Sequence, residues 1–288
     1  MEMIGQEGRI YREGGSVVVE VPGKAYLLDI EGVICTNPDD DEMARIYRRV
    51  FRKKQVYLPH EYDRAVAEHL SGRDVLVIGA NGYSRLSADQ CRAYGVEVGS
   101  YETAAAKMLY EMIRSAQEQH PGVSIRLVHG ASDMGIDRSL ISVASKLNLN
   151  NLGFSCPKFM FYVRDDDTAV YVGESQEAYA DAFVRSLDLL VAVNGREQAF
   201  KHDISAVFRH QKHLIPVNLL RVISSNGGPP AIMDDGSIGD AVALFEQRVH
   251  HVGLSIRSWQ DLLDSTARTV SDMCRSNLSP ERAYGYTL

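Results

Sequence analysis

The sequence contains few cysteines, and none of them lies close to another. Cys35, Cys91, Cys156 and Cys274 form no CxxC pair. This spacing excludes the common zinc-binding and thiol-redox motifs, which need closely spaced cysteines. We therefore expect reduced thiols that pack as small hydrophobic residues, as is usual in an intracellular protein.

Long apolar segments are also missing from the sequence. The first residues, MEMIGQEGRIYREGG, contain no apolar signal segment. No run of apolar residues approaches the length that a membrane-spanning helix requires. We expect a cytoplasmic protein that has no membrane partner.

An excess of positive charge is the third missing feature. The formal net charge is −7, whereas proteins that grip nucleic acid through its phosphates are usually basic. Nucleic acid is therefore an unlikely partner. Hydrophobic residues make up 45% of the chain and charged residues 24%, which is the composition of a globular protein with a sizeable core.

From Arg73 onward, apolar segments alternate with segments of helical composition. Continuously apolar strands that alternate with helices indicate a parallel sheet covered on both faces. We therefore predict an α/β fold with a Rossmann-like open, mostly parallel sheet and helices on both faces. The expected strands include Asp74–Gly82, Val123–Ser132, Ala169–Gly173 and Asp188–Gly195, and the expected helices are Thr103–Gln119, Asp137–Leu147, Glu174–Leu187 and Arg196–Gln211.

The two ends of the chain differ from this middle part. Residues 1–70 are predicted to form an N-terminal β/α extension, with β segments at Ser16–Val21 and Ala25–Cys35 and a helix at Asp39–Lys54. Residues 71–223 form the predicted ligand-binding domain. Residues 224–288 comprise a loop and two amphipathic helices, Ile238–His250 and Ser258–Cys274, which either pack on the sheet or mediate oligomerisation. We expect a homo-oligomer.

Glycine-containing loops follow several of the expected strands. In an open parallel sheet, ligands bind beyond the carboxyl ends of the strands. Glycine lets the backbone approach an anion, and free N–H groups at a helix N-terminus hold phosphate. The loops therefore predict a nucleotide or phosphate site. Its candidate ligand-binding residues are Gly79, Asn81, Gly82, Gly130, Ser132, Gly135, Asp137, Arg138, Ser175, Asn194, Gly195 and Arg196.

Individual roles can be assigned within these loops. Gly130 and Gly135 would permit the turn, and Ser132 would donate to a phosphate or cap the helix. Asp137 is either the N-cap of the following helix or an acceptor for a ribose hydroxyl. Arg138 and Arg196 are either surface residues or bidentate phosphate ligands.

Two longer segments resemble a known family. GASDMGIDRSLISVAS and AFVRSLDLLVAVNGREQAFKHDISAVFRHQKHLIPVNL are similar to segments of the SLOG superfamily, and the resemblance covers roughly Arg73–Leu220. The superfamily includes the lonely-guy phosphoribohydrolases, bacterial DNA-processing proteins and sensor domains of antiphage defence. The resemblance implies a Rossmann-like nucleotide-binding domain, whose ligand in some members is related to NAD or is a cyclic ADP-ribose.

The catalytic motif of the phosphoribohydrolases is incomplete in this chain. VNGREQAFKHD stands where those enzymes carry PGGxGTxxE, so the later glycine, threonine and glutamate are missing. Hydrolysis of an N-glycosidic bond needs a carboxylate, and the candidates for this role are Glu174 and Asp203. The expected function is binding of a nucleotide or NAD/ADP-ribose-like ligand, as a sensor or binding protein or as an N-glycosidic-bond hydrolase. No cofactor or metal is expected.

Two other functions fit parts of the sequence. LLDIEGVICT resembles the first motif of haloacid-dehalogenase-type phosphatases, in which Asp29 would be the nucleophile and Glu31 the acid/base beside Mg²⁺. A lysine followed by a paired-acid loop, which such enzymes need, is not found. A non-catalytic oligomeric scaffold is the third alternative, because no catalytic motif is complete.

Overall fold

A computed structural model describes most of the chain. The described residues are 9–13, 16–21, 24–29, 32–35, 56–83, 86–132, 134–156, 168–172, 176–194, 197–228 and 258–277. The expected helices Asp39–Lys54 and Ile238–His250 lie outside these ranges, as do the candidate site residues Glu174, Ser175, Gly195 and Arg196 and the acid Glu31.

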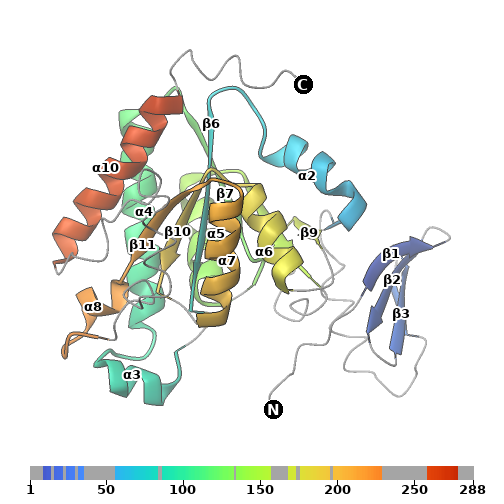
Figure 1. Ribbon diagram of the computed structural model, residues 1–288, viewed down its shortest axis with the longest axis horizontal. Helices are drawn as coiled ribbons and strands as arrows, with labels where there is room; N and C mark the ends of the chain where they lie inside the picture. The colour runs from blue at the N-terminus through green and yellow to red at the C-terminus, as the bar shows by residue number, and fades with distance from the viewer. Residues whose placement is uncertain are drawn as a thin grey trace.

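The centre of the molecule is a parallel sheet of seven strands (Figure 1). Its order is β11-β10-β6-β7-β8-β9-β5, and every neighbouring pair is parallel. This arrangement confirms the predicted fold class. The strands are β5 (Val56–Tyr57), β6 (Val75–Gly82), β7 (Ser124–His129), β8 (Asn151–Ser155), β9 (Ala169–Tyr171), β10 (Leu189–Val193) and β11 (His213–Val217).

Helices cover both faces of this sheet and form two hydrophobic cores. One core contains side chains of α3 (Ala88–Tyr94), α4 (Ser100–Gln119), α5 (Gly135–Leu147), α8 (Leu219–Ile223) and α10 (Trp259–Asn277). The other contains side chains of α2 (Tyr62–His69), α6 (Gln176–Arg185) and α7 (Glu197–Arg209), and a 3-10 turn, η1 (Pro59–Glu61), precedes α2. Every residue of β10 is buried, as a strand covered on both faces requires.

Gly79 lies inside β6, where it pairs with Leu190 and Val128 of the neighbouring strands. A Cβ atom at Gly79 would lie 2.6 Å from Leu187 Cδ2 and 3.1 Å from Phe183 Cζ. The missing side chain therefore lets α6 and the segment after it approach the sheet closely. This position gives Gly79 a packing role, since it lies three residues before the end of the strand.

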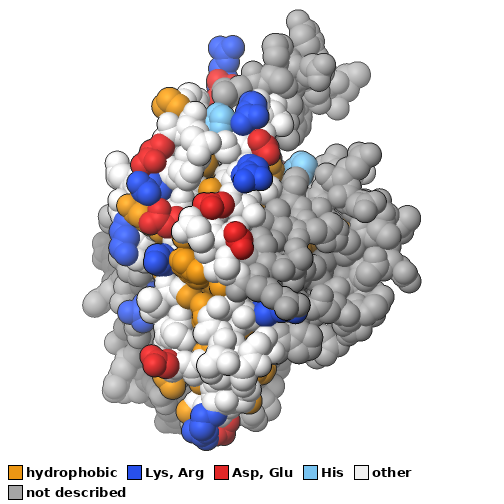
Figure 2. Space-filling model, turned by 90° about the vertical axis from the view of Figure 1, so that its left-hand side faces the viewer, with side chains coloured by type: hydrophobic (Ala, Val, Ile, Leu, Met, Phe, Trp, Pro, Cys, Tyr) orange, Lys and Arg blue, Asp and Glu red, His pale blue; other side chains and the backbone are white. Residues whose placement is uncertain are grey.

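The C-terminal helix α10 packs along α4 (Figure 1). One of its faces buries Leu262, Thr266, Val270 and Cys274, which recur every four residues. The sequence left two roles open for this helix, packing on the sheet or oligomerisation. The structure shows it packed on the domain. Figure 2 shows the side of the molecule that carries α10, where acidic and basic side chains are interspersed among the described residues.

The N-terminal strands form a separate antiparallel sheet. They are β1 (Arg9–Glu13), β2 (Ser16–Val21), β3 (Lys24–Asp29) and β4 (Gly32–Cys35), paired in chain order. Asp29 ends β3 and pairs with Gly32 across a hairpin. The phosphatase interpretation needs this aspartate at the carboxyl end of a strand in the parallel sheet, and the antiparallel pairing does not provide that setting. Within the described ranges, no helix is both long and apolar enough to cross a membrane.

Candidate functional site

The site lies where the winding of the sheet reverses. After β6 the chain adds β7, β8 and β9 on one side, and α6 then carries it back to β10 on the other side of β6. The loops that follow β6 and β10 therefore leave the sheet in opposite directions. In folds of this type, the resulting crevice at the carboxyl edge is where ligands bind.

A partly buried pair of polar side chains lies at this edge. Asn81, near the end of β6, donates from Nδ2 to Oδ2 of Asp203 on α7 over 2.6 Å. Asp203 is only 7% exposed. The Oδ1 atom of Asn81 is also buried, and it has no hydrogen-bond partner among the described residues. Buried amide oxygens are nearly always satisfied, so this acceptor is a candidate contact for a ligand.

The pKa of Asp203 is raised to about 7. Burial is the main cause, because it disfavours the charged carboxylate. The hydrogen bond from Asn81 opposes this shift, whereas the nearby carboxylate of Asp137 adds to it. Asp203 therefore changes its charge close to neutral pH, which is the property of a general acid or base.

Asp137 is not the N-cap of α5, contrary to one of the two roles expected for it. The helix begins at Gly135 and its N-cap is Met134, which makes no side-chain capping bond. The Oδ1 atom of Asp137 accepts the backbone N–H of Gly130 over 2.7 Å. Burial raises the pKa of Asp137, while His129 and hydrogen bonds from Gly130 and Ser132 act in the opposite direction.

Three backbone N–H groups at the start of the loop after β7 are used within the chain. Those of Gly130 and Ser132 bind Asp137, and that of Ala131 donates to Nδ1 of His129 over 3.0 Å. This part of the loop therefore presents a carboxylate at the site, and its three N–H groups are not free for a phosphate. The Ser132 hydroxyl donates weakly to the carbonyl of Met134, at 3.4 Å.

Space and backbone conformation explain the two glycines of this loop. A Cβ atom at Gly130 would lie 2.6 Å from Oδ2 of Asp137 and 2.8 Å from the hydroxyl oxygen of Tyr179. Gly135 has a φ of +51°, in the left-handed region that favours glycine. Ala131 adopts a φ of +55° without being glycine, which is a strained conformation of the kind that collects at functional sites.

Tyr179 on α6 is the main site residue that the sequence did not predict. Burial raises its pKa well above the usual value, and the carboxylates of Asp137 and Asp203 raise it further. Its ring lies parallel to that of Phe183, with the ring centres 6.1 Å apart. The spacing of four residues between these two aromatic side chains is the only sequence signal that indicates a common buried face.

The remaining predicted residues have structural contacts or lie elsewhere. Asn194 donates to Oδ1 of Asn218 over 2.9 Å and accepts the N–H of Leu220 over 3.0 Å, so it connects the end of β10 to α8. A Cβ atom at Gly82 would lie 2.6 Å from the carbonyl oxygen of Val193 and would also collide with a tyrosine hydroxyl. Arg138 has an exposed side chain on α5.

The structure thus brings Asn81, Gly130, Asp137 and Asp203 together with Tyr179 at one edge of the sheet. Within the described part of the chain, no three His, Cys, Asp or Glu side chains are grouped so that they could hold a metal ion. The arrangement is a partly buried, acceptor-rich cluster with one hydroxyl group and two carboxyl groups whose pKa values are raised.

Comparison with known proteins found solved structures with a similar fold, but it found no family. No family model and no curated protein matches the sequence. Among solved structures, the chain is similar to the molybdenum cofactor carrier protein of Chlamydomonas reinhardtii, with 14% identity, a TM-score of 0.43 and coverage of 70% of this chain and 98% of that chain. It is also similar to the molybdenum cofactor binding protein of Rippkaea orientalis, with 15% identity, a TM-score of 0.41 and coverage of 69% and 98%. Membership of the SLOG superfamily stays a prediction, and the chain is an α/β protein with a Rossmann-like parallel sheet by its own strand order.

Proposed function

We propose that the carboxyl edge of the sheet binds a nucleotide or an NAD/ADP-ribose-like molecule, and that the protein acts as a sensor or carrier of this ligand. The observation that carries the proposal is the convergence of Asn81, Asp203, Asp137 and Tyr179 at the reversal of the sheet. A free buried acceptor and two carboxyl groups suit a ligand part rich in O–H and N–H donors.

The same residues also suggest how the ligand is oriented. In their charged forms, the carboxyl groups of Asp137 and Asp203 would repel a phosphate, because the charges have the same sign. Ribose hydroxyls or the amino group of a base, which donate hydrogen bonds, suit these acceptor groups better. The phosphates would then lie away from these carboxyl groups. Gly195 and Arg196, for which the sequence predicted a phosphate-binding role, lie outside the described residues.

A catalytic variant of this function rests on Asp203. A carboxyl group with a pKa of about 7 exchanges its proton readily at neutral pH. It would serve as the general acid or base in hydrolysis of the N-glycosidic bond of the bound nucleotide. The sequence predicted the same catalytic role for Asp203, and this role stays a proposal. Glu174, the other candidate, lies outside the described residues.

The scaffold alternative fits these observations less well. Burial of a carboxyl group destabilises the folded protein unless the group stays protonated or gains partners. A purely structural domain gains nothing from two such groups beside an unsatisfied amide oxygen. Perturbed carboxyl groups gathered in a crevice are instead typical of functional sites.

One experiment separates binding from hydrolysis. The protein is mixed with AMP, NAD⁺ or ADP-ribose, its melting temperature is measured, and the mixture is then analysed by chromatography. Stabilisation without release of a free base supports a sensor or carrier, since a ligand that binds only the native state raises stability. Release of adenine or nicotinamide that Asp203→Asn abolishes supports hydrolysis. The proposal fails if none of the three ligands changes the melting temperature and none is cleaved.

A further inference from the structure

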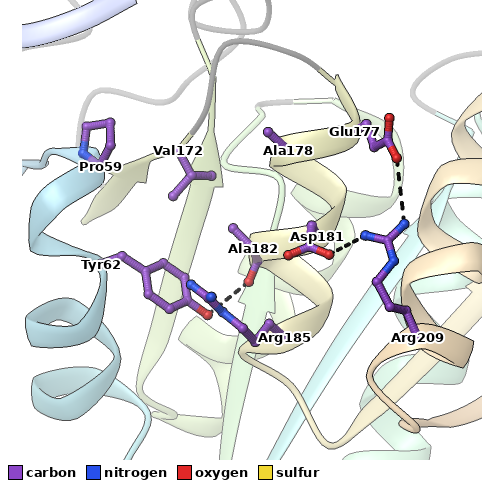
Figure 3. A pocket seen from close by; sticks show the side chains of 9 residues that line it. All are labelled: Pro59, Tyr62, Val172, Glu177, Ala178, Asp181, Ala182, Arg185 and Arg209. Atoms are coloured by element: carbon purple, nitrogen blue, oxygen red, sulfur yellow. Dashed lines mark hydrogen bonds and ion pairs between the residues drawn. The ribbon is translucent and has the colours of Figure 1, made fainter.

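A second cavity lies away from the carboxyl-edge site. It has a volume of about 620 Å³ and opens between α2 and α6 (Figure 3). Tyr62 of α2 forms one wall, and Val172, Ala178 and Ala182 contribute apolar surface on the other side. Asn81, Asp137 and Asp203 are not among its lining residues. The volume falls in the range of small-molecule sites, which is roughly 300–1,000 Å³.

Arg185 of α6 is held in a fixed position at this cavity. Its guanidinium carbon lies 4.3 Å from the centre of the Tyr62 ring. The Tyr62 hydroxyl donates to the carbonyl oxygen of Ala182 over 3.1 Å, which fixes the ring that supports the guanidinium group. A hydrogen bond with Tyr62 is also the main cause that raises the pKa of Arg185. The guanidinium group is therefore preorganised and charged.

A comparison with other stacked arginines shows what distinguishes Arg185. Arg64 lies over the ring of Tyr57, at 5.1 Å, and forms an ion pair with Glu61 over 2.9 Å. Arg114 also lies over a tyrosine ring and is paired with two glutamates. Arg185 has no carboxylate within 4 Å among the residues that the structure describes. Asp63 and Asp181 act on it only through their charge at longer range.

The acidic residues of the cavity are already paired. Asp181 and Glu177 both bind Arg209 (Figure 3). Asp181 also lies 2.9 Å from Nε2 of His210. Burial would raise the pKa of Asp181, but the hydrogen bonds from His210 and Arg209 outweigh it and lower this pKa. Of the two arginines that line the cavity, Arg209 is therefore ion-paired, whereas Arg185 makes no ion pair with a described carboxylate. The two acids of the lining, Glu177 and Asp181, would repel a phosphate dianion more strongly than a ligand with one negative charge.

We propose that the cavity between α2 and α6 binds a small organic monocarboxylate with an apolar body. The planar guanidinium group of Arg185 would bind the carboxylate through two parallel hydrogen bonds. The apolar body would pack against Val172, Ala178 and Ala182, whose small side chains leave room beside α6. This site is independent of the nucleotide site proposed above.

The test uses benzoate as the probe and benzamide as its neutral counterpart of the same shape. Binding is followed by the backbone amide NMR signals of Val172, Ala178 and Ala182 in the full-length protein. Benzoate is expected to shift these signals saturably and to bind more tightly than benzamide. Arg185→Gln should weaken benzoate binding by about tenfold, because it removes one charge-assisted interaction, and should leave benzamide binding unchanged.

Arg64→Gln is the matched control. It removes an exposed arginine that also lies on a tyrosine ring but is already ion-paired, so benzoate affinity should not change. Three results would overturn the proposal. They are equal affinities for benzoate and benzamide, an affinity for benzoate that Arg185→Gln does not reduce, or shifts confined to Gly130, Asn81 and Asp203, which would place benzoate at the carboxyl-edge site.

Discussion

At the scale of single residues, the most unusual feature is the burial of Asp203. Its carboxyl group has a pKa of about 7 in the folded protein, against 3.8 as the ordinary value. The folded state therefore holds the proton of Asp203 over a pH range in which the unfolded state has released it. Between about pH 4 and pH 7, this difference lowers the stability of the protein as the pH rises.

Replacement of Asp203 tests this coupling. Asp203→Asn removes the titrating group and keeps the shape of the side chain, so the loss of stability between pH 4 and pH 7 should become smaller. Each pKa unit corresponds to about 1.4 kcal/mol, so the change should amount to a few kcal/mol across this range. The measurement is the free energy of unfolding in urea at a series of pH values. Asp63→Asn, at an exposed position, is the control. An unchanged pH dependence in Asp203→Asn would contradict this account.

Asp137 shows what the sequence alone did not reveal about single residues. Its position before an apolar helix made an N-cap one of the two roles predicted for it, but the helix begins two residues earlier, at Gly135, whose φ is left-handed. Its carboxylate therefore turns back to the loop and binds Gly130. A cap depends on the exact first residue of a helix, and sequence patterns locate helix ends only approximately.

At the scale of elements, alternation of apolar and helical segments predicted most of the sheet and its covering helices. It did not predict which side chains meet across the sheet. Asn81 and Asp203 are 122 residues apart, and their contact depends on the register of β6 against β10 and on the rotation of α7. Tyr179 was missed for the same reason, because its partners come from α5 and α7.

The close approach of α6 to β6 can be tested at Gly79. Gly79→Ala would place a Cβ atom 2.6 Å from Leu187 Cδ2, and such overpacking typically costs about 1–3 kcal/mol. Gly122→Ala is the control, because nothing lies within 4 Å of its added Cβ atom. Chemical denaturation should show a loss of stability for Gly79→Ala only. Equal stabilities of the two variants would mean that the strand and the helix are not packed as described.

The attachment of α10 to α4 depends partly on Ser271. Its hydroxyl donates to Oε1 of Gln119 over 2.8 Å and lies 2.7 Å from Nε2 of His120. Ser271→Ala leaves these partners without a bond in a partly buried position, which should cost about 1–3 kcal/mol. Ser276→Ala, on the exposed part of the same helix, should change stability by less than about 0.5 kcal/mol. If both variants unfold at the same denaturant concentration, the contact does not stabilise α10.

At the scale of the whole molecule, the chain combines a Rossmann-like domain with a separate N-terminal antiparallel sheet and a C-terminal helix that packs on the domain. Composition and hydrophobic patterning predicted the first of these well. The number of N-terminal strands was not predicted, because β1 was not expected and because β3 and β4 lie in a segment that reads as one strand.

Oligomerisation remains our prediction for this protein. Light scattering coupled to size-exclusion chromatography should give a mass that is a multiple of 32.0 kDa. A mass of 32.0 kDa at all concentrations would show that the chain is a monomer.

The central claim is that a nucleotide-like ligand binds at the carboxyl edge, above Asp137 and Asp203. Calorimetric titration of the protein with AMP, NAD⁺ and ADP-ribose tests it most directly, with Gly130→Ala as the decisive variant and Gly122→Ala as the control. The added methyl group at Gly130 would occupy the space between Asp137 and Tyr179. We predict that at least one ligand binds the original protein and the control equally, and binds the folded Gly130→Ala variant at least tenfold more weakly, as expected for the loss of a few contacts. Absence of binding for all three ligands, or equal binding to Gly130→Ala, would contradict the claim.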